Sequence, residues 1–142
     1  MTIRNAINTL QSKGIKPSIQ RIAIMEYLLS HRTHPTVEEV YDALNKKIPT
    51  LSKTTVYNTL RLFSENGAAQ MLTIDEKRLC FDGDTAPHGH FLCHVCGRIF
   101  DVPLPKELFS FRPLPEEFDV KEMQVYYKGI CKECGQKPQR KE

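Results

Sequence analysis

The sequence predicts an α+β protein with two domains. Three observations support this class: the first half shows successive helical patterns followed by a short hairpin pattern, the surplus of positive charge is confined to that half, and two Cys-x-x-Cys pairs fall in the second half. We expect a first domain at residues 1–82, a hinge at 83–87 and a second domain at 88–142. Domains this small are marginally stable on their own, so a metal ion or an oligomeric contact is expected to support them.

The composition excludes several classes of protein. The chain has 142 residues, of which 40% are apolar and 26% charged, the balance of a soluble globular protein. No apolar run approaches the roughly 20 residues that a membrane-spanning helix needs, and the first residues lack the apolar core of a secretory signal. We therefore expect a cytoplasmic protein with no membrane partner, whose five cysteines are thiols or metal ligands.

Four helices are expected in the first half, because each pattern has its own boundary signals. Gly14 ends the first helix, Pro17-Ser18 opens the second, and Thr36-Val-Glu-Glu39 has the spacing of a capping box that starts the third. Ser52 caps the fourth helix, which ends at Asn66-Gly67. Apolar residues at helical spacing give the expected core faces, which are in order Ile3, Ala6, Ile7 and Leu10; Ile22, Met25 and Leu29; Val37, Val40, Tyr41 and Leu44; and Val56, Leu60 and Phe63.

A short hairpin, or wing, follows the fourth helix. Residues 70–74 and 78–82 flank the turn Asp75-Glu76-Lys77. Residues 1–79 contain 11 Lys and Arg against 7 Asp and Glu, a net charge of +4, whereas residues 80–142 contain 9 against 10, a net charge of −1. Helices, a wing and a basic balance together predict a winged helix-turn-helix domain that binds nucleic acid.

The fourth helix is the expected reader of double-stranded DNA. A polar stripe at i, i+3, i+4 and i+7 lies opposite its apolar face, although a merely solvated helix face carries such a stripe too. The residue types in the stripe are those that contact base edges and phosphates. The expected DNA contacts are Lys53, Thr54, Tyr57, Asn58 and Arg61.

The second half is predicted to form a small α/β domain. Residues 90–95 and 98–102 are β-leaning segments around a cysteine-containing turn, and residues 120–130 are expected to form a further strand. Four prolines from Pro103 to Pro115 leave room only for a short helix around residues 106–109. The polar tail at residues 135–142 is expected to fray.

Two Cys-x-x-Cys pairs, each followed by glycine, are made by Cys93, Cys96, Cys131 and Cys134. Two residues between thiolates allow one tight turn to present both sulfur atoms to one ion, so two such turns complete a tetrahedron. Four sulfur ligands with no open position favour a structural Zn²⁺; redox-active dithiols are the alternative. The fifth cysteine, Cys80, is expected to pack in the hairpin as a small apolar side chain.

The segment His88-Gly-His90 is a second candidate for metal binding. Residues two apart in an extended segment point the same way, so both imidazoles are expected on one side. Asp82 precedes this segment and Asp101 ends the following strand. Imidazole and carboxylate ligands suit Mn, Fe, Zn or Ni. His94, inside the first Cys-x-x-Cys turn, is interpreted as a spacer.

Seven segments are distinctive in their order and spacing: Pro17-Ser-Ile-Gln-Arg21, His34-Pro-Thr36, Thr54-Thr-Val-Tyr-Asn58, residues 78–82, His88-Gly-His90, Cys93-x-x-Cys96 with Asp101, and Cys131-x-x-Cys134. In these segments the chain resembles the Fur family of ferric uptake regulators and their metal- and peroxide-sensing relatives, and the resemblance covers nearly the whole chain. Asp101 and Asn58 resemble the peroxide-responsive repressor subgroup, because iron-uptake regulators commonly have Glu and often have Arg at these places.

The resemblance implies a homodimeric, metal-dependent transcriptional repressor that is not an enzyme, binds a palindromic operator and takes no small organic substrate. An ion bound by ligands from both halves would fix their orientation, and with it the distance between the reading helices of a dimer. In peroxide-sensing relatives the oxidised residues correspond to His34 and His88. The implied ligands of a regulatory Fe²⁺ or Mn²⁺ are His34, Asp82, His88, His90 and Asp101.

The chain also departs from the family, and other functions stay open. Many members have a further metal site, which we expect to be absent here because Pro87 and Gly89 flank the histidines and the last strand offers Glu122 and Met123. Because the segment at 103–115 is rich in proline, the sequence does not decide whether the usual dimerisation helix is present. The main alternative is an iron-responsive repressor; a non-haem iron enzyme with an open facial triad and a zinc-stabilised protein-interaction module are the others.

Overall fold

The computed structural model describes residues 2–110, 114–120 and 122–136; the rest of the tail expected to fray, residues 137–142, lies outside this range. The chain divides into two compact units, Met1–Thr85 and Ala86–Glu142. This division falls within residues 83–87, where we expected the hinge. Among the described residues, none of the helices combines the length and the apolar character that crossing a bilayer requires.

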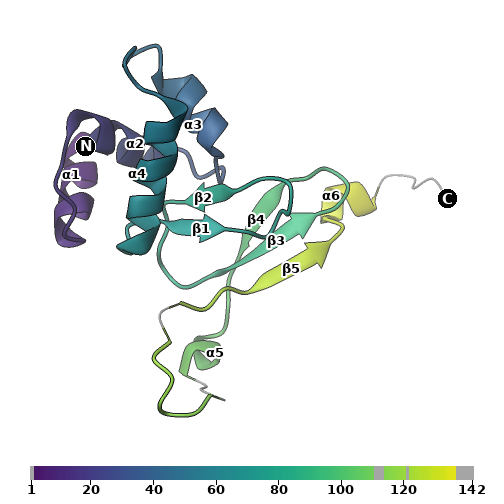
Figure 1. Ribbon diagram of the computed structural model, residues 1–142. Coiled ribbons are helices and arrows are strands. Elements are labelled where there is room, and N and C mark those ends of the chain that lie inside the picture. Colours follow the sequence, from purple (N-terminus) through teal and green to yellow (C-terminus); the bar gives the residue numbers. More distant parts are fainter. Residues whose placement is uncertain (1, 111–113, 121, 137–142) are drawn as a thin grey trace. The chain divides into compact units, whose positions relative to one another are not determined.

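Four helices begin the first unit, close to the positions expected from the sequence (Figure 1). Their N-terminal signals act as expected: the hydroxyls of Ser18 and Ser52 accept hydrogen bonds from backbone N–H groups three residues later, and Thr36 and Glu39 form the capping box. Gly14 has a φ of 72°, a left-handed conformation that glycine adopts without strain after the first helix. The helices are α1 (Thr2–Ser12), α2 (Ile19–Ser30), α3 (Val37–Leu44) and α4 (Lys53–Glu65).

The helices pack around one apolar core, and the face expected for α2 is wrong in part. This helix buries Ile24, Met25 and Leu28, whereas Ile22 and Leu29 are only partly buried. The reason is that α2 contacts α1, α3 and α4, so apolar residues surround much of it and spacing alone does not select the innermost face. In α1 the core begins at Ala6, one turn later than expected, and Ile3 is exposed. The faces of α3 and α4 bury Val40, Leu44, Val56, Leu60 and Phe63, as expected, whereas Val37 and Tyr41 of α3 are only partly buried.

The hairpin consists of β1 (Gln70–Leu72) and β2 (Cys80–Asp82), which pair antiparallel. Both strands are shorter than expected because the residues between them form a long connecting turn. The carboxylate of Asp75 closes this turn by accepting hydrogen bonds from the backbone N–H of Lys77 and from Nε of Arg78, both at 3.0 Å.

The other edge of β2 pairs with the segment ahead of α3. The N–H of Phe81 donates to the carbonyl of Pro35 at 2.9 Å, and Thr36 forms an antiparallel bridge with Cys80. Residues 34–36 therefore lie beside β2, although some 45 residues separate the two segments in the sequence.

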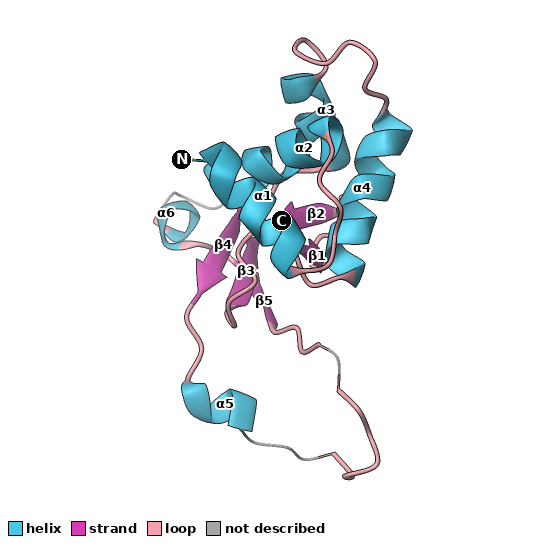
Figure 2. Cartoon of the chain, turned by 90° about the vertical axis from the view of Figure 1, so that its left-hand side faces the viewer, coloured by secondary structure: helices cyan, strands magenta, loops and turns pink. Residues whose placement is uncertain are grey.

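The second unit contains a three-stranded sheet with the order β4-β3-β5 (Figure 2). Strand β3 (Gly89–Cys93) pairs antiparallel with β4 (Ile99–Val102) and parallel with β5 (Tyr126–Gly129). A short helix follows β4 and another follows β5, namely α5 (Lys106–Ser110) and α6 (Lys132–Gly135).

The last strand is shorter than the expected 120–130. Within the described part of that range, residues 126–129 pair with β3, a strand of five residues that limits the length of pairing. Val120 and Met123, which belong to the same β-leaning run, are exposed outside the sheet. Helix α6 was not expected as a helix; its N-cap residue Cys131 and its residue Cys134 form the second Cys-x-x-Cys pair.

Candidate functional sites

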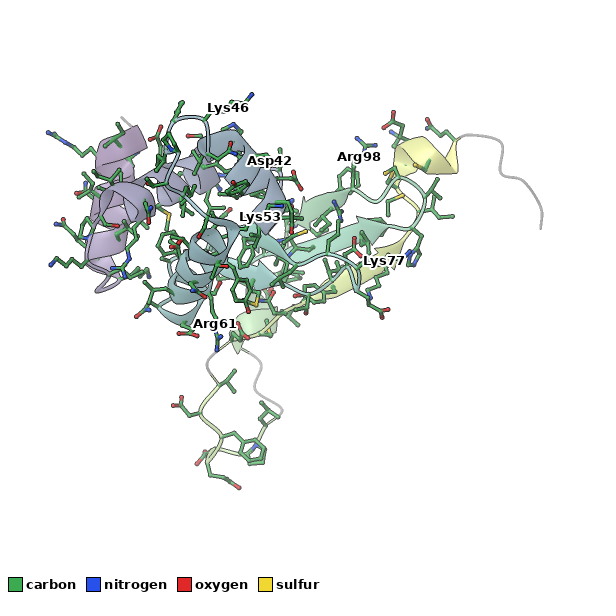
Figure 3. The ribbon with its side chains drawn as sticks, turned by 45° about the horizontal axis from the view of Figure 1, so that its top comes forward. Asp42, Lys46, Lys53, Arg61, Lys77 and Arg98 are labelled. Atoms are coloured by element: carbon green, nitrogen blue, oxygen red, sulfur yellow. The ribbon has the colours of Figure 1, made fainter. Side chains whose placement is uncertain are left out.

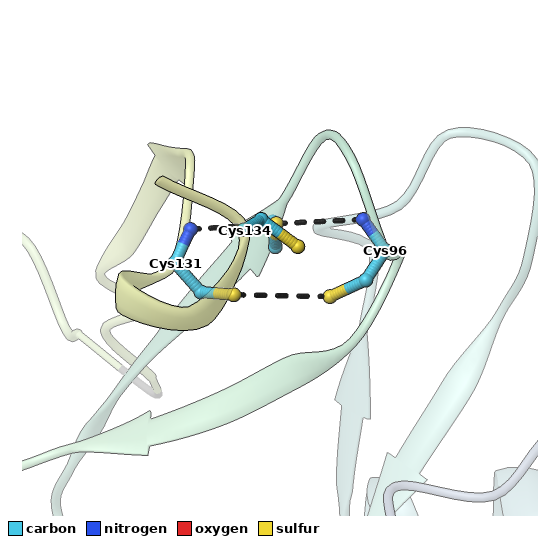
Figure 4. A group of neighbouring side chains, drawn as sticks. Cys96, Cys131 and Cys134 are labelled. Carbon is cyan, nitrogen blue, oxygen red and sulfur yellow. Dashed lines mark hydrogen bonds between the residues drawn. The ribbon is translucent and has the colours of Figure 1, made fainter. Parts of the chain in front are cut away.

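Four cysteine sulfur atoms gather at one end of the second unit, as the spacing predicts. The Sγ atoms of Cys93, Cys96, Cys131 and Cys134 all lie within 4.8 Å of one another, and those of Cys96 and Cys131 are 3.9 Å apart (Figure 4). In a tetrahedral zinc site with Zn–S bonds of about 2.3 Å, two ligand sulfur atoms are about 3.8 Å apart. The cluster therefore has the size and the donor set of a structural zinc site.

Local turns explain why the sulfur atoms meet. After β3, the N–H of Gly97 donates to the carbonyl of Cys93 at 2.9 Å, and Gly97 takes a φ of 75° that reverses the chain into β4. Cys131 is the N-cap residue of α6 and Cys134 lies within that helix, so one helical turn presents both side chains. Since β3 and β5 are parallel neighbours, the two turns emerge at the same end of the sheet.

The protein environment shifts the thiol pKa values of Cys93, Cys96 and Cys134 in different directions. The backbone N–H groups of Cys96 and Cys131 donate to Sγ of Cys93, at 3.5 and 3.4 Å, and lower the pKa of Cys93 to about 5. A hydrogen bond from Arg98 lowers the pKa of Cys96, whereas burial raises the pKa of Cys134 to about 12. Backbone donors therefore stabilise one thiolate in advance, while Cys134 ionises only when a cation replaces its proton.

Cys80 and His94 are not members of this cluster. Cys80 is 1% exposed in β2, where burial raises the pKa of its thiol, so it packs as a small apolar side chain. His94 is exposed in the turn between Cys93 and Cys96.

A buried imidazole–carboxylate pair lies in the first unit. Nε2 of His34 is 3.5 Å from Oδ2 of Asp82, and both residues are buried. The other oxygen of Asp82 accepts a hydrogen bond from the N–H of Asp84 at 2.8 Å, and Asp84 forms an ion pair with Arg32 at 3.3 Å. The carboxylate of Asp82 is thereby oriented, with one oxygen directed toward the imidazole.

A second cluster of the same chemistry lies in the second unit. Nε2 of His88 and Nε2 of His90 lie 3.4 and 3.5 Å from the same oxygen of Asp101, which faces His90 across the β3–β4 ladder. Both imidazoles therefore point the same way, as expected from their spacing. Nδ1 of His88 is 2.6 Å from the carbonyl oxygen of Ala86. Because a carbonyl can only accept, Nδ1 is the donor in this contact, which leaves Nε2 as the nitrogen that could bind a metal ion.

Helix α4 separates its apolar and polar faces as predicted. Thr54, Tyr57, Asn58 and Arg61 are exposed, opposite the buried face of the helix. Two of the expected DNA contacts have partners within the first unit: Nζ of Lys53 lies 5.5 Å from the centre of the Tyr41 ring, and Nε of Arg61 donates to Glu65 at 2.9 Å (Figure 3).

Further basic residues, which were not among the DNA contacts expected from the sequence, lie near α4. A cavity of about 440 Å³ next to Thr55 is lined by Lys16 and Arg21, and Nη1 of Arg21 donates to the carbonyl of Lys16 at 2.9 Å. A groove of about 600 Å³ between α3, α4 and the hairpin is lined in part by Lys77. The sequence already predicted where α2 begins. The position of Lys16 and Arg21 on either side of its N-cap could therefore have identified them as neighbouring basic residues.

Comparisons with known proteins match most of the chain, including the greater part of both units. A family model described as the ferric uptake regulator family matches residues 12–128. The chain is 37% identical to the peroxide-responsive repressor PerR of Staphylococcus epidermidis over 134 residues, which cover 93% of this chain and 89% of that protein. It is also 37% identical to PerR of Staphylococcus aureus over 137 residues, covering 95% and 93%.

Solved structures give the same picture of the fold. The ferric uptake regulator of Helicobacter pylori matches with a TM-score of 0.70 at 19% identity, covering 97% of this chain and 94% of that one. PerR of Streptococcus pyogenes, described for peroxide sensing and gene regulation, matches with a TM-score of 0.52 at 26% identity, covering 94% and 92%.

Proposed function

The chain belongs to the ferric uptake regulator family, and from this we propose that it is a metal-dependent, DNA-binding transcriptional repressor that senses peroxide. The relatives at 37% identity are peroxide-responsive repressors, which favours peroxide over iron as the signal. The repressor acts in the cytoplasm, and it is a regulator rather than an enzyme.

The four-cysteine cluster holds a structural Zn²⁺. Cys93, Cys96, Cys131 and Cys134 supply four thiolates and leave no open position for a substrate, so the ion contributes folding energy to a unit with a small core. This assignment is supported by the separation of 3.9 Å between the sulfur atoms of Cys96 and Cys131.

The regulatory ion is Fe²⁺ or Mn²⁺, bound by His34, Asp82, His88, His90 and Asp101. The observation that carries the proposal is that each unit presents nitrogen and oxygen ligands close together, with a hydrogen bond that orients Asp82 in one unit and His88 in the other. These ligands suit Fe²⁺ and Mn²⁺. Because they come from both units, an ion that binds all five favours one orientation of the units. Bound Fe²⁺ supplies the reducing power toward peroxide that Mn²⁺ lacks.

The DNA partner is a palindromic operator bound by a homodimer. Lys53, Thr54, Tyr57, Asn58 and Arg61 of each α4 face one half-site, and the distance between the two helices decides whether both dock together. Metal and operator then favour the same conformation, so each must tighten the binding of the other. Oxidation of His34 or His88 removes a metal ligand and releases the DNA.

The proposed function is tested by metal analysis of the purified protein together with DNA binding. DNA selected from a random-sequence library in the presence of Mn²⁺ should contain an inverted repeat. Binding to it should weaken when the regulatory metal is removed with a mild chelator that leaves zinc in place. An iron-responsive repressor, the second candidate, would lose DNA binding on iron removal and keep it after a low dose of peroxide.

A further inference from the structure

The guanidinium group of Arg98 connects the two Cys-x-x-Cys turns of the second unit. Its Nε–H donates to Sγ of Cys96 at 3.4 Å, and its Nη2–H donates to Oε2 of Glu133. Cys96 lies in the turn between β3 and β4, whereas Glu133 lies on α6 between the other two zinc ligands. Figure 3 shows Arg98 beside α6. One side chain therefore bridges the two turns that must stay together for all four sulfur atoms to face one ion.

The neighbours of Arg98 hold it in this position. Its carbonyl accepts a hydrogen bond from the N–H of Cys93 at 3.1 Å, which fixes its backbone at the start of β4. Its guanidinium carbon lies 5.2 Å from the centre of the Phe100 ring, a cation–π contact. Because the guanidinium is planar and presents its donors in a rigid fork, this placement directs one N–H at sulfur and another at the carboxylate.

Cys96 is the most accessible of the four cysteines. Cys93 and Cys134 are buried and Cys131 is partly buried, whereas Cys96 is exposed. An oxidant arriving from solvent therefore meets Cys96 first. A Zn²⁺ ion with four thiolates carries a net charge of −2, and a hydrogen bond from a cation stabilises that charge on sulfur, which makes the sulfur a weaker nucleophile.

We propose that Arg98 is a positioning residue that protects the Cys96 ligand from oxidation and slows the loss of zinc. In the reaction that it opposes, the Cys96 sulfur attacks one oxygen of H₂O₂, an S–O bond forms as the O–O bond breaks, and the other oxygen leaves as hydroxide. The sulfur is oxidised by two electrons to a sulfenic acid, which condenses with the Cys131 thiol, 3.9 Å away, to give a disulfide and water. This inference rests on the proposed zinc ligands and is independent of the regulatory metal and of DNA.

The test measures zinc release from the full-length protein loaded with Zn²⁺ and Mn²⁺, so that no iron takes part. Excess H₂O₂ is added and the freed zinc is followed with a chromogenic chelator. Arg98→Ala should release zinc about tenfold faster than the wild type, the size of effect that loss of a hydrogen bond to a charged group produces. Lys132→Ala is the matched control, because it removes an exposed cation next to Cys131, at the start of α6. It should stay within about twofold of the wild type.

Peptide mapping identifies the thiol that reacts first. In Arg98→Ala the earliest oxidised residue should be Cys96, followed by a Cys96–Cys131 disulfide. A wild-type release rate in Arg98→Ala, or equal acceleration by Lys132→Ala, would overturn the proposal, the second because net charge alone would then be responsible. If Arg98→Ala does not fold, Arg98→Lys keeps a cation without the fork and must still release zinc about threefold faster or more. A wild-type protein purified without zinc would instead contradict the proposed ligands.

Discussion

Nε2 of His34 lies 3.5 Å from Oδ2 of Asp82, and both residues are buried in the first unit. The contact exists because the segment ahead of α3 pairs with the edge of β2, through the bridge between Thr36 and Cys80. His34 also has a φ of 57°, a left-handed conformation that costs a non-glycine residue about 1 kcal/mol or more. The fold therefore maintains a strained backbone at a residue that we propose as a metal ligand.

Replacing His34 should separate metal sensing from stability. His34→Asn removes the imidazole but tolerates the left-handed backbone, so the free energy of unfolding should stay within about 1 kcal/mol of the wild type. DNA binding in Mn²⁺ should fall about tenfold or more, because one ligand of the regulatory metal is missing. Urea unfolding and fluorescence anisotropy measure the two effects. His94→Asn, at an exposed position that is not a proposed metal ligand, should change neither the free energy of unfolding nor DNA binding. Wild-type Mn²⁺ dependence in His34→Asn would remove this residue from the ligand set.

Loss of one sulfur ligand should disrupt the second unit. In Cys131→Ser the zinc content should fall from one ion per chain to near zero, and the protein should unfold or become monomeric, because the energy of zinc binding is folding energy in so small a unit. Metal analysis, circular dichroism and size-exclusion chromatography report these changes. Cys80→Ala should keep its zinc, since Cys80 is not one of the four clustered cysteines. A well-folded, zinc-free dimer of Cys131→Ser contradicts the structural role of the ion.

DNA binding should depend strongly on salt and on α4. Arg61→Ala and Tyr57→Ala should each weaken binding, because both side chains are exposed on the proposed reading face. Asn58→Arg should change the preferred sequence, since Asn and Arg pair with different bases. The measurements are binding isotherms at several salt concentrations and selection from a random library. If log K hardly changes with log[salt], few phosphates are contacted and the DNA assignment fails.

The carboxylate of Glu65 should restrain Arg61. Nε of Arg61 donates to Oε1 of Glu65 at 2.9 Å, and both side chains are more than half exposed. Glu65→Gln removes a negative charge near the DNA and frees the guanidinium, so affinity should rise about two- to fivefold. A double-mutant cycle with Arg61→Ala checks the mechanism, because the gain should largely disappear when Arg61 is absent. An equal gain in both backgrounds would point to general electrostatics rather than to this pair.

The parts of the fold that local rules govern could be predicted from the sequence. Caps at Ser18, Thr36 and Ser52 depend on residues within one helical turn, and each lies where it was expected. The sulfur cluster was also predictable, because the doubled Cys-x-x-Cys spacing restricts each pair to one turn. The length of β5 was not, since it depends on how many residues of β3 are available for pairing.

His34 and Arg98 could not be found from spacing. His34 entered the ligand set only through the family resemblance, because its contact with Asp82 depends on strand pairing between distant segments. Arg98 lies two residues after the first Cys-x-x-Cys pair. Its role depends on the hydrogen bond that it donates to Glu133, a residue of the other Cys-x-x-Cys turn. Side-chain contacts between distant segments of the chain can be identified only once the folded structure is known.

Mass spectrometry of the Fe²⁺-loaded protein after a brief, low dose of H₂O₂ tests the peroxide-sensing proposal most directly. One oxygen atom of peroxide should enter an imidazole while the other leaves as water, so peptides that contain His34 or His88 should gain one oxygen atom. The Mn²⁺-loaded protein should stay unmodified, and only the oxidised Fe²⁺ form should release its DNA. Unmodified histidines beside oxidised cysteines, or no modification with DNA binding retained, would contradict peroxide sensing through the bound iron.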